Sequence, residues 1–171
     1  MGIGKRVVSE SEIQAKVRDL AAELTAAYPG GALLVAVLKG SFLFLADLVR
    51  ELPPTFEVDF LAVRSYQGTQ SSGAVEIVLD LATDITGRDL VLVEDIVDTG
   101  LTLDYLHRLL SARGPRSLRI ASLFFKPAAH RGEVKPDWVG FEIPPQFVVG
   151  YGMDVNERYR GLRDVVEYQD E

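Results

Sequence analysis

The sequence predicts an α/β fold in which a central, mainly parallel sheet is flanked by helices. Strand-like and helix-like segments alternate from Ala32 to Phe125, the pattern of consecutive βαβ units. Three of these segments, 32–38, 89–93 and 117–125, are rich in apolar residues, as expected of strands buried inside a parallel sheet. Ligands bind such sheets beyond the carboxyl ends of the strands. We therefore expect the functional site just after Leu38, Val93 and Phe125.

The individual elements follow from apolar periodicity and from the residues that interrupt it. Ser9 and Glu12 form a predicted capping box before a helix that includes residues 13–24 and ends at Tyr28-Pro29-Gly30-Gly31. The next predicted elements are strand 32–38, helix 42–51, strand 56–63, strand 74–81, strand 89–93, helix 101–112 and strand 117–125. The polar segment 65–73 lacks a core face and is predicted to be a mobile loop. After Lys126, short strand-like pieces at 138–142, 147–151 and 165–168 are separated by proline, glycine and charge.

Length and composition fit one soluble domain. The chain has 171 residues, 47% hydrophobic and 25% charged, which are average values for a globular protein. Its net charge of −7 argues against a protein that binds nucleic acid through a broad basic face. The absence of cysteine excludes disulfides, thiolate metal sites and a cysteine nucleophile. No signal peptide or membrane-spanning run is apparent, so we expect a cytoplasmic protein.

The segment from Leu90 to Leu103 carries the strongest functional signal. An apolar strand runs into two carboxylates, Glu94 and Asp95, and then into Asp98-Thr99-Gly100-Leu101-Thr102 at the start of a helix. The free N–H groups of the helix start and the threonine hydroxyls can bind a phosphate, while the two acids can bind sugar hydroxyls directly or through hydrated metal. The pattern thus predicts a site for a phosphorylated ribose. The alternative is an acidic turn in which Asp98 only caps the helix.

The run Glu94–Thr102 resembles the phosphoribosyl pyrophosphate (PRPP) signature of type I phosphoribosyltransferases, and is closest to the hypoxanthine-guanine branch. The resemblance covers nearly the whole chain, because further segments match that family in the right order. They are Leu38-Lys39-Gly40 (the pyrophosphate loop), Ser65-Tyr66 (the start of a catalytic loop), Phe124-Phe125-Lys126 (a strand end that meets the purine), and residues 136–144 and 147–154 (the base-binding hood). The resemblance implies the type I phosphoribosyltransferase fold. It also implies one domain over residues 1–171, with a core at about 30–126 and a hood from about 127–171 plus the N-terminal segment.

The resemblance assigns roles around the base. Asp98 becomes the acceptor of the purine proton, with the helix cap as its alternative. Lys126 is expected at the 6-oxo group, since an ammonium donates hydrogen bonds and accepts none; a surface lysine is the alternative. Phe147 is expected to stack on the base, although a core position is the commoner reading of such a residue, and the backbone of Val148 to contact the purine edge. Ser65 and Tyr66 are expected to close over the site as catalytic residues that exclude water.

The resemblance also assigns roles around PRPP. Glu94 and Asp95 become ligands of ribose and Mg²⁺, and Asp154 a ligand of a second Mg²⁺; for Asp154 and Arg160 a solvated charged loop is the alternative. Pyrophosphate is expected on Lys39, Gly40 and Arg160. The family often has a cis peptide in this loop, which would lie between Leu38 and Lys39, but the residues themselves do not show it. The remaining substrate-binding residues are Ile96, Val97, Thr99, Gly100, Leu101 and Thr102. Leu101 departs from family members with lysine there, which removes one cation near the phosphate. His107 and His130 fit no catalytic pattern.

The implied activity is purine salvage: Mg²⁺-dependent transfer of the 5-phosphoribosyl group from PRPP to hypoxanthine or guanine, which gives IMP or GMP and pyrophosphate. The expected partners are these small molecules and copies of the chain itself in a homodimer or homotetramer, with no nucleic acid and no membrane. Two alternatives remain open: the same fold acting on xanthine or another base, and a PRPP-fold regulator that binds RNA.

Overall fold

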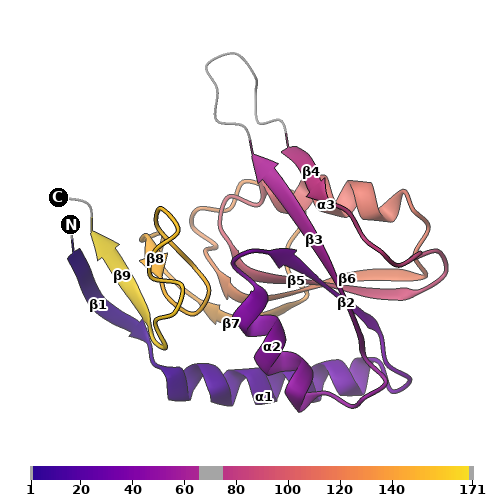
Figure 1. Cartoon of the computed structure of the whole chain (residues 1–171), viewed down its shortest axis with the longest axis horizontal. Helices are drawn as coiled ribbons and strands as arrows, with labels where there is room; N and C mark the ends of the chain where they lie inside the picture. The colour runs from indigo at the N-terminus through magenta and orange to yellow at the C-terminus, as the bar shows by residue number, and fades with distance from the viewer. Residues whose placement is uncertain (1, 66–74, 170–171) are drawn as a thin grey trace.

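The computed structural model describes residues 2–65 and 75–169, which form two sheets and three helices (Figure 1). The larger sheet has six strands in the order β4-β3-β2-β5-β6-β7, and all its pairs are parallel except β3 with β4. Its strands are β2 (Leu33–Leu38), β3 (Glu57–Ser65), β4 (Val75–Leu79), β5 (Asp89–Val97), β6 (Ser117–Phe125) and β7 (Trp138–Glu142). The predicted mainly parallel α/β fold is confirmed.

Helices cover both faces of this sheet (Figure 1). Helices α1 (Glu10–Ala27) and α2 (Phe42–Glu51) pack on one face, where Leu20 and Phe44 join a core with alternate residues of β2 and β5. Helix α3 (Leu101–Ser111) packs on the other face through Leu103, Leu106 and Leu110. The predicted capping box is present at the start of α1, because Glu12 N–H donates to the Ser9 hydroxyl and Ser9 N–H donates to the Glu12 carboxylate.

Strand β5 is longer than the sequence analysis predicted, and this changes where the acidic pair lies. We expected the strand to end at Val93 and the acids to form a turn. Instead β5 continues to Val97 because β6 stays apolar and pairs with it to the end, with Glu94 opposite Ser122 and Val97 opposite Phe125. Glu94 and Asp95 therefore lie within the strand, and the turn contains only residues 98–100.

A second sheet with the order β1-β9-β8 is antiparallel and stands beside the larger one (Figure 1). Its strands are β1 (Gly2–Val8), β8 (Val148–Val149) and β9 (Val165–Gln169). Strand β1 was not predicted, and β8 is shorter than the predicted 147–151 piece. Strand β7, which we grouped with the hood segment, pairs with β6 in the larger sheet. The division into core and hood stays a prediction. None of the helices in the described part of the chain is long and apolar enough to cross a membrane.

Candidate active site

The candidate site lies where β2, β5 and β6, three neighbours in the larger sheet, reach their carboxyl ends. Lys39 and Gly40 follow β2, Asp98 follows β5 and Lys126 follows β6. Since Val97 is the register partner of Phe125, the next residue of each strand emerges beside the other. Sheet register thus brings Asp98 and Lys126 together, although they are 28 residues apart in the sequence.

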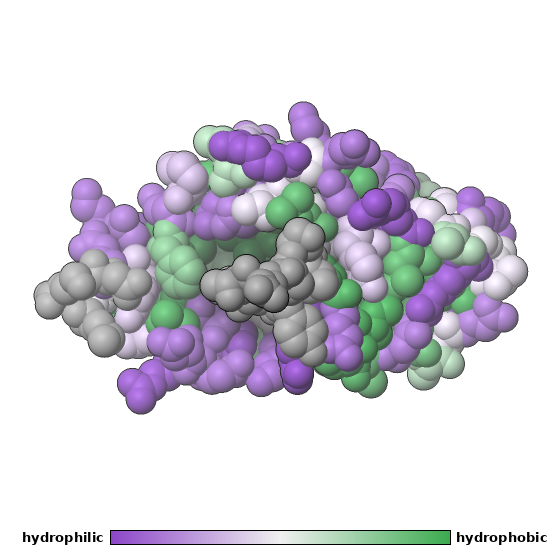
Figure 2. Space-filling view, turned by 90° about the horizontal axis from the view of Figure 1, so that it is seen from above, coloured by the Kyte–Doolittle hydropathy of each residue, from purple (hydrophilic) through white to green (hydrophobic). Residues whose placement is uncertain are grey.

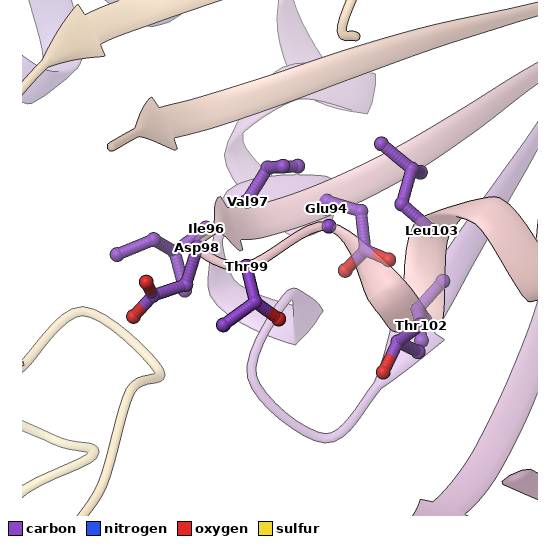
Figure 3. A pocket seen from close by; sticks show the side chains of 9 residues that line it. Glu94, Ile96, Val97, Asp98, Thr99, Thr102 and Leu103 are labelled. Atoms are coloured by element: carbon purple, nitrogen blue, oxygen red, sulfur yellow. The ribbon is translucent and has the colours of Figure 1, made fainter. Parts of the chain in front are cut away.

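A first pocket lies at the start of α3. Glu94, Asp98, Thr99, Gly100 and Thr102 line it, together with Val37, Ile96, Val97 and Leu103. The first hydrogen bond of the helix runs from Asp104 N–H to the carbonyl of Gly100, so the N–H groups of residues 101–103 have no partner within the helix. Such a group of amides, together with the two threonine hydroxyls, can bind an anion. Figure 3 shows the Thr99 and Glu94 side chains on one side of the turn and the Asp98 carboxylate pointing away from them.

Asp98 does not cap α3, so the helix-cap alternative is wrong. The N-cap is Gly100, with φ of 85°, and no side chain donates or accepts a capping hydrogen bond there. The Asp98 carboxylate instead accepts a 2.7 Å hydrogen bond from the Lys126 ammonium. Because the Asp98 side chain is 46% exposed while that of Lys126 is 6% exposed, the pair presents its carboxylate to solvent and keeps the lysine stem inside.

A second pocket adjoins the first and shares Ile96 and Asp98 with it. Lys126 lies at its base, and Phe147, Val148 and Met153 of the second-sheet region form an apolar wall. Lys126 is buried, so the surface-lysine alternative is wrong. Phe147 is 52% exposed and contacts Tyr168 edge to face with 5.9 Å between ring centroids, so it is not a core residue. An exposed aromatic ring beside a buried hydrogen-bond donor suits a flat, polar-edged ligand.

Charged side chains form the opposite end of the second pocket. Asp95, Asp154, Arg160 and Gly40 line it, and Arg160 Nη2 lies 3.0 Å from Asp154 Oδ1. Gly40 must be glycine here, because a Cβ atom would lie 1.9 Å from the Asp95 carboxylate. The buried Nε of Arg160 has no hydrogen-bond partner in the described residues, which leaves one donor for a ligand. The peptide between Leu38 and Lys39 is cis, as the family resemblance implied.

The acids of β5 have unusual electrostatics. Burial, and then the neighbouring charge of Asp95, raises the pKa of Glu94 well above its usual range. Burial likewise raises the pKa of Asp95 to about 6, against the opposing effects of backbone N–H groups and the Arg160 charge. Two adjacent buried carboxylates favour binding of a proton or a metal ion. Within residues 2–65 and 75–169, no three His, Cys, Asp or Glu side chains converge in a way that could hold a metal ion.

Some predicted site residues are not tested. Ser65 is the last residue of β3, and Tyr66 lies outside the described residues. Leu101 is 61% exposed at the first turn of α3 and does not line the first pocket, whereas Thr99 and Thr102 do. The two predicted metal ligands on β5 separate, with Glu94 in the first pocket and Asp95 beside Asp154 in the second.

One charged residue of the site, Glu157, was not predicted from the sequence. Its carboxylate lies 3.1 Å from the Lys39 ammonium and 3.2 Å from Arg160 Nη2. Hydrogen bonds from Lys39 and Arg160 hold the pKa of Glu157 below its usual range. Glu157 therefore joins the two cations that we expected to bind pyrophosphate. No local signal points to this contact, since Lys39 and Glu157 are 118 residues apart in the sequence.

Comparison with known proteins identifies the family. The model of the phosphoribosyl transferase domain matches residues 6–156. The chain belongs to the phosphoribosyltransferase family. It is 48% identical to a hypoxanthine-guanine phosphoribosyltransferase of Bacillus subtilis over 94% of this phosphoribosyltransferase and 90% of the relative. It is 47% identical to the Mycobacterium tuberculosis enzyme of that name, and the match covers 91% of this phosphoribosyltransferase and 81% of the relative.

Solved structures agree with this assignment. A hypoxanthine-guanine phosphoribosyltransferase of Bacillus anthracis superposes with a TM-score of 0.93 at 36% identity, covering 98% of this phosphoribosyltransferase and 100% of the other chain. A hypoxanthine phosphoribosyltransferase of Trypanosoma cruzi in complex with the product IMP superposes with a TM-score of 0.91 at 38% identity. The match covers 98% of this phosphoribosyltransferase and 95% of the other chain. The recognised family therefore extends over both sheets and both pockets of this phosphoribosyltransferase.

Proposed function

We propose that this phosphoribosyltransferase transfers the 5-phosphoribosyl group of PRPP to hypoxanthine or guanine, giving IMP or GMP and pyrophosphate, in purine salvage. The observation that carries the proposal is the Asp98–Lys126 pair at the base of the second pocket. It offers a hydrogen-bond acceptor directly beside a donor. A 6-oxopurine with a proton on the adjacent ring nitrogen presents the complementary donor and acceptor.

The same pair favours a 6-oxo over a 6-amino purine. The ammonium of Lys126 only donates hydrogen bonds, so an exocyclic amino group opposite it would leave two donors facing each other. Lys126 is buried, and an unsatisfied buried donor costs about 1–3 kcal/mol. Phe147 supplies an exposed ring on which the base can stack. Adenine should therefore be a poor acceptor.

The two pockets divide PRPP between them. The amides and hydroxyls at the start of α3 bind the 5-phosphate, and Lys39, Gly40 and Arg160 bind the pyrophosphate. As the bond between C1 of the ribose and pyrophosphate breaks, the purine nitrogen forms its bond to the same carbon. Asp98 accepts the proton that the purine loses. Ser65 and Tyr66 are proposed to exclude water from this step.

Glu94, Asp95 and Asp154 are the residues proposed to hold Mg²⁺. They fit the ion because carboxylate oxygens are its preferred protein ligands, and because the raised pKa of Asp95 reflects burial without full compensation. When bound, the ion neutralises charge on the leaving pyrophosphate. The fit is to an ion shared with substrate, since the described residues form no closed cage.

The proposal is tested by measuring nucleotide formation from PRPP with hypoxanthine, guanine, xanthine and adenine, each with Mg²⁺ and with EDTA. We expect IMP and GMP with the metal and no product without it. If only xanthine or only adenine gave product, hypoxanthine and guanine would be the wrong acceptors. If no base gave product, the proposed reaction would be refuted. A cytoplasmic location stays a prediction.

A homodimer or homotetramer is proposed from an exposed apolar surface. In the view of Figure 2 the surface is mainly hydrophilic, with a band of hydrophobic side chains right of the centre. Large hydrophobic side chains are exposed on β3, β4 and the start of α2, namely Val58, Phe60, Val78, Leu79 and Phe42. Val58 and Phe60 share one face of β3, as alternate residues of a strand do. Light scattering after gel filtration should give a multimer for the wild type and a smaller species for Phe60→Glu; a monomeric wild type would refute the proposal.

A further inference from the structure

The loop 130–134, which lies between β6 and β7, is hydrogen-bonded to the turn that lines the first pocket. The carbonyl oxygen of Thr99 accepts hydrogen bonds from Arg131 N–H at 2.8 Å and from Gly132 N–H at 3.0 Å. A trans peptide is planar, and its C=O and N–H point in opposite directions. The N–H of Gly100, which belongs to the same peptide as the Thr99 carbonyl, is therefore directed away from loop 130–134.

That N–H is free to bind an anion. Within the described part of the chain, no residue accepts a hydrogen bond from Gly100 N–H, and Gly100 lines the first pocket. If the peptide were flipped, the Thr99 carbonyl oxygen would face the bound phosphate and repel it. The Gly100 N–H would then face the two N–H groups of Arg131 and Gly132. The orientation of this one peptide thus decides whether the turn attracts or repels an anion.

Asp104 holds loop 130–134 in place from the first turn of α3. Its carboxylate accepts hydrogen bonds from Glu133 N–H at 2.9 Å and 3.1 Å and from Val134 N–H at 2.9 Å. Partial burial opposes ionisation, but these two N–H groups hold the pKa of Asp104 below its usual range. Gly132 fits tightly between the partners, because a Cβ atom there would lie 2.9 Å from both the Asp104 carboxylate and the Gly100 carbonyl oxygen.

His130 closes the space behind the same peptide. A Cβ atom on Gly100 would lie 2.3 Å from Cε1 of the imidazole, whose ring packs edge-on against Phe125 with 5.3 Å between centroids. The imidazole thus lies directly against the turn at Gly100. It adds packing to the hydrogen bonds that Asp104 maintains.

We propose that Asp104 is a positioning residue for the 5-phosphate. By holding loop 130–134 against α3, it fixes the Thr99–Gly100 peptide with its N–H toward the first pocket. Asp104 does not line that pocket, so it acts only through this peptide. The inference rests on the proposed function for the identity of the anion.

The test uses Asp104→Leu and Asp104→Asn, titrated by calorimetry with ribose 5-phosphate and, separately, with inorganic pyrophosphate. Asp104→Leu removes the acceptors of both N–H groups, and we expect ribose 5-phosphate to bind at least about tenfold more weakly. Asp104→Asn keeps one acceptor oxygen and should restore part of the affinity. Pyrophosphate binding should not change. In steady-state assays KM for PRPP should rise, while kcat at saturating PRPP and KM for hypoxanthine stay near wild type.

The matched control is Asp84→Leu, which removes a carboxylate that accepts Thr86 N–H at 2.9 Å in a turn remote from both pockets. It should leave both affinities unchanged. Unchanged ribose 5-phosphate binding in Asp104→Leu, or equal losses for ribose 5-phosphate and pyrophosphate, would overturn the inference. If Asp104→Leu does not fold, the affinities of Asp104→Asn for ribose 5-phosphate and for pyrophosphate provide the same test. A wild-type protein that binds neither ligand and makes no nucleotide would instead refute the proposed function.

Discussion

The two sides of the site, to which we assign the 5-phosphate and the pyrophosphate of PRPP under the proposed function, are built in different ways. On the phosphate side the backbone supplies the donors, glycine occupies the positive-φ position at Gly100, and main-chain hydrogen bonds from loop 130–134 fix the turn. On the pyrophosphate side the two cations already pair with carboxylates of the protein: Lys39 with Glu157, and Arg160 with Asp154 and Glu157. The first side can bind its ligand without rearrangement, whereas the second must exchange ion pairs for ligand contacts.

Backbone conformation shows the same contrast. The non-glycine residues with positive φ in the described residues are Tyr151, Asn156, Glu157 and Tyr159, and all of them belong to the segment that forms the pyrophosphate side. Such conformations cost roughly 1–3 kcal/mol each. The burial of Tyr151 in the core and its main-chain hydrogen bond to the carbonyl of Leu162 offset part of that cost. The strain on the pyrophosphate side is therefore balanced by the packing of this segment and not by its ion pairs.

The largest effect should come from Asp98→Asn, where the two sides meet. Loss of the proton acceptor should lower kcat by about 10²–10⁴. Ribose 5-phosphate binding should be unchanged, because the Asp98 carboxylate points away from Thr99 (Figure 3). Initial rates of IMP formation and calorimetry measure the two effects. Turnover near wild type would show that Asp98 is not the proton acceptor.

Gly100→Ala should damage the phosphate side alone. The new methyl group meets the His130 ring, and φ at this position is 85°. We therefore expect the free energy of unfolding to fall by about 3 kcal/mol. Ribose 5-phosphate affinity should fall with pyrophosphate affinity retained. Chemical denaturation measures the change in stability, and calorimetry measures the two ligand affinities. Gly114→Ala, at φ of 71° with open space around it, is the control that separates backbone strain from the clash. Equal effects of the two substitutions would contradict the role of His130.

Asp95→Asn should reveal the electrostatic cost of the pyrophosphate side. The folded-state pKa of about 6 is above the ordinary 3.8, so the folded protein binds more protons between these pH values and its stability falls as pH rises through them. The wild type should therefore lose on the order of 3 kcal/mol of stability from this group by pH 7. The asparagine variant, measured with EDTA, should be more stable at pH 7 and show no gain at pH 4. A gain independent of pH would contradict this explanation.

Glu157→Gln should have the smallest effect. Glu157 and Lys39 are both mostly exposed, so their pairing is worth less than about 1 kcal/mol. Removing the charge should tighten pyrophosphate binding by about two- to fivefold at low salt, and the gain should shrink as salt screens it. Glu51→Gln, an exposed acid at the end of α2, serves as the control. Weaker pyrophosphate binding would mean that Glu157 helps the cations instead of competing for them.

Much of the fold could be predicted because the core elements have clear apolar patterns. The bounds predicted for α2, β6 and β7 agree with the structure residue for residue. Strand β1 was missed because its residues are mostly exposed and show no alternation, and its partner β9 lies at the other end of the described chain. The continuation of β5 through two acids was missed because local preference opposes it, while pairing with β6 imposes it.

Site residues next to one another in the sequence were easier to predict than contacts between distant segments. The run Asp98–Thr102 and Lys126 lie together because they follow adjacent strands, a consequence of topology that the strand pattern already implied. Glu157, Asp104 and the packing of His130 depend on how separate loops meet. Nothing near these residues in the sequence distinguishes them from ordinary surface charges or from a solvated loop.

The register of β5 with β6 has an evolutionary consequence. Lys126 is the residue proposed to set the hydrogen-bond polarity at the acceptor base, yet its position is fixed by the main-chain pairing of Val97 with Phe125 and not by its own side chain. A substitution at this position therefore changes the hydrogen-bonding groups offered to the base without changing the strand register that places the turn after β5. An ancestral scaffold of this kind can diversify its acceptors by single codon changes, and a protein engineer can follow the same route.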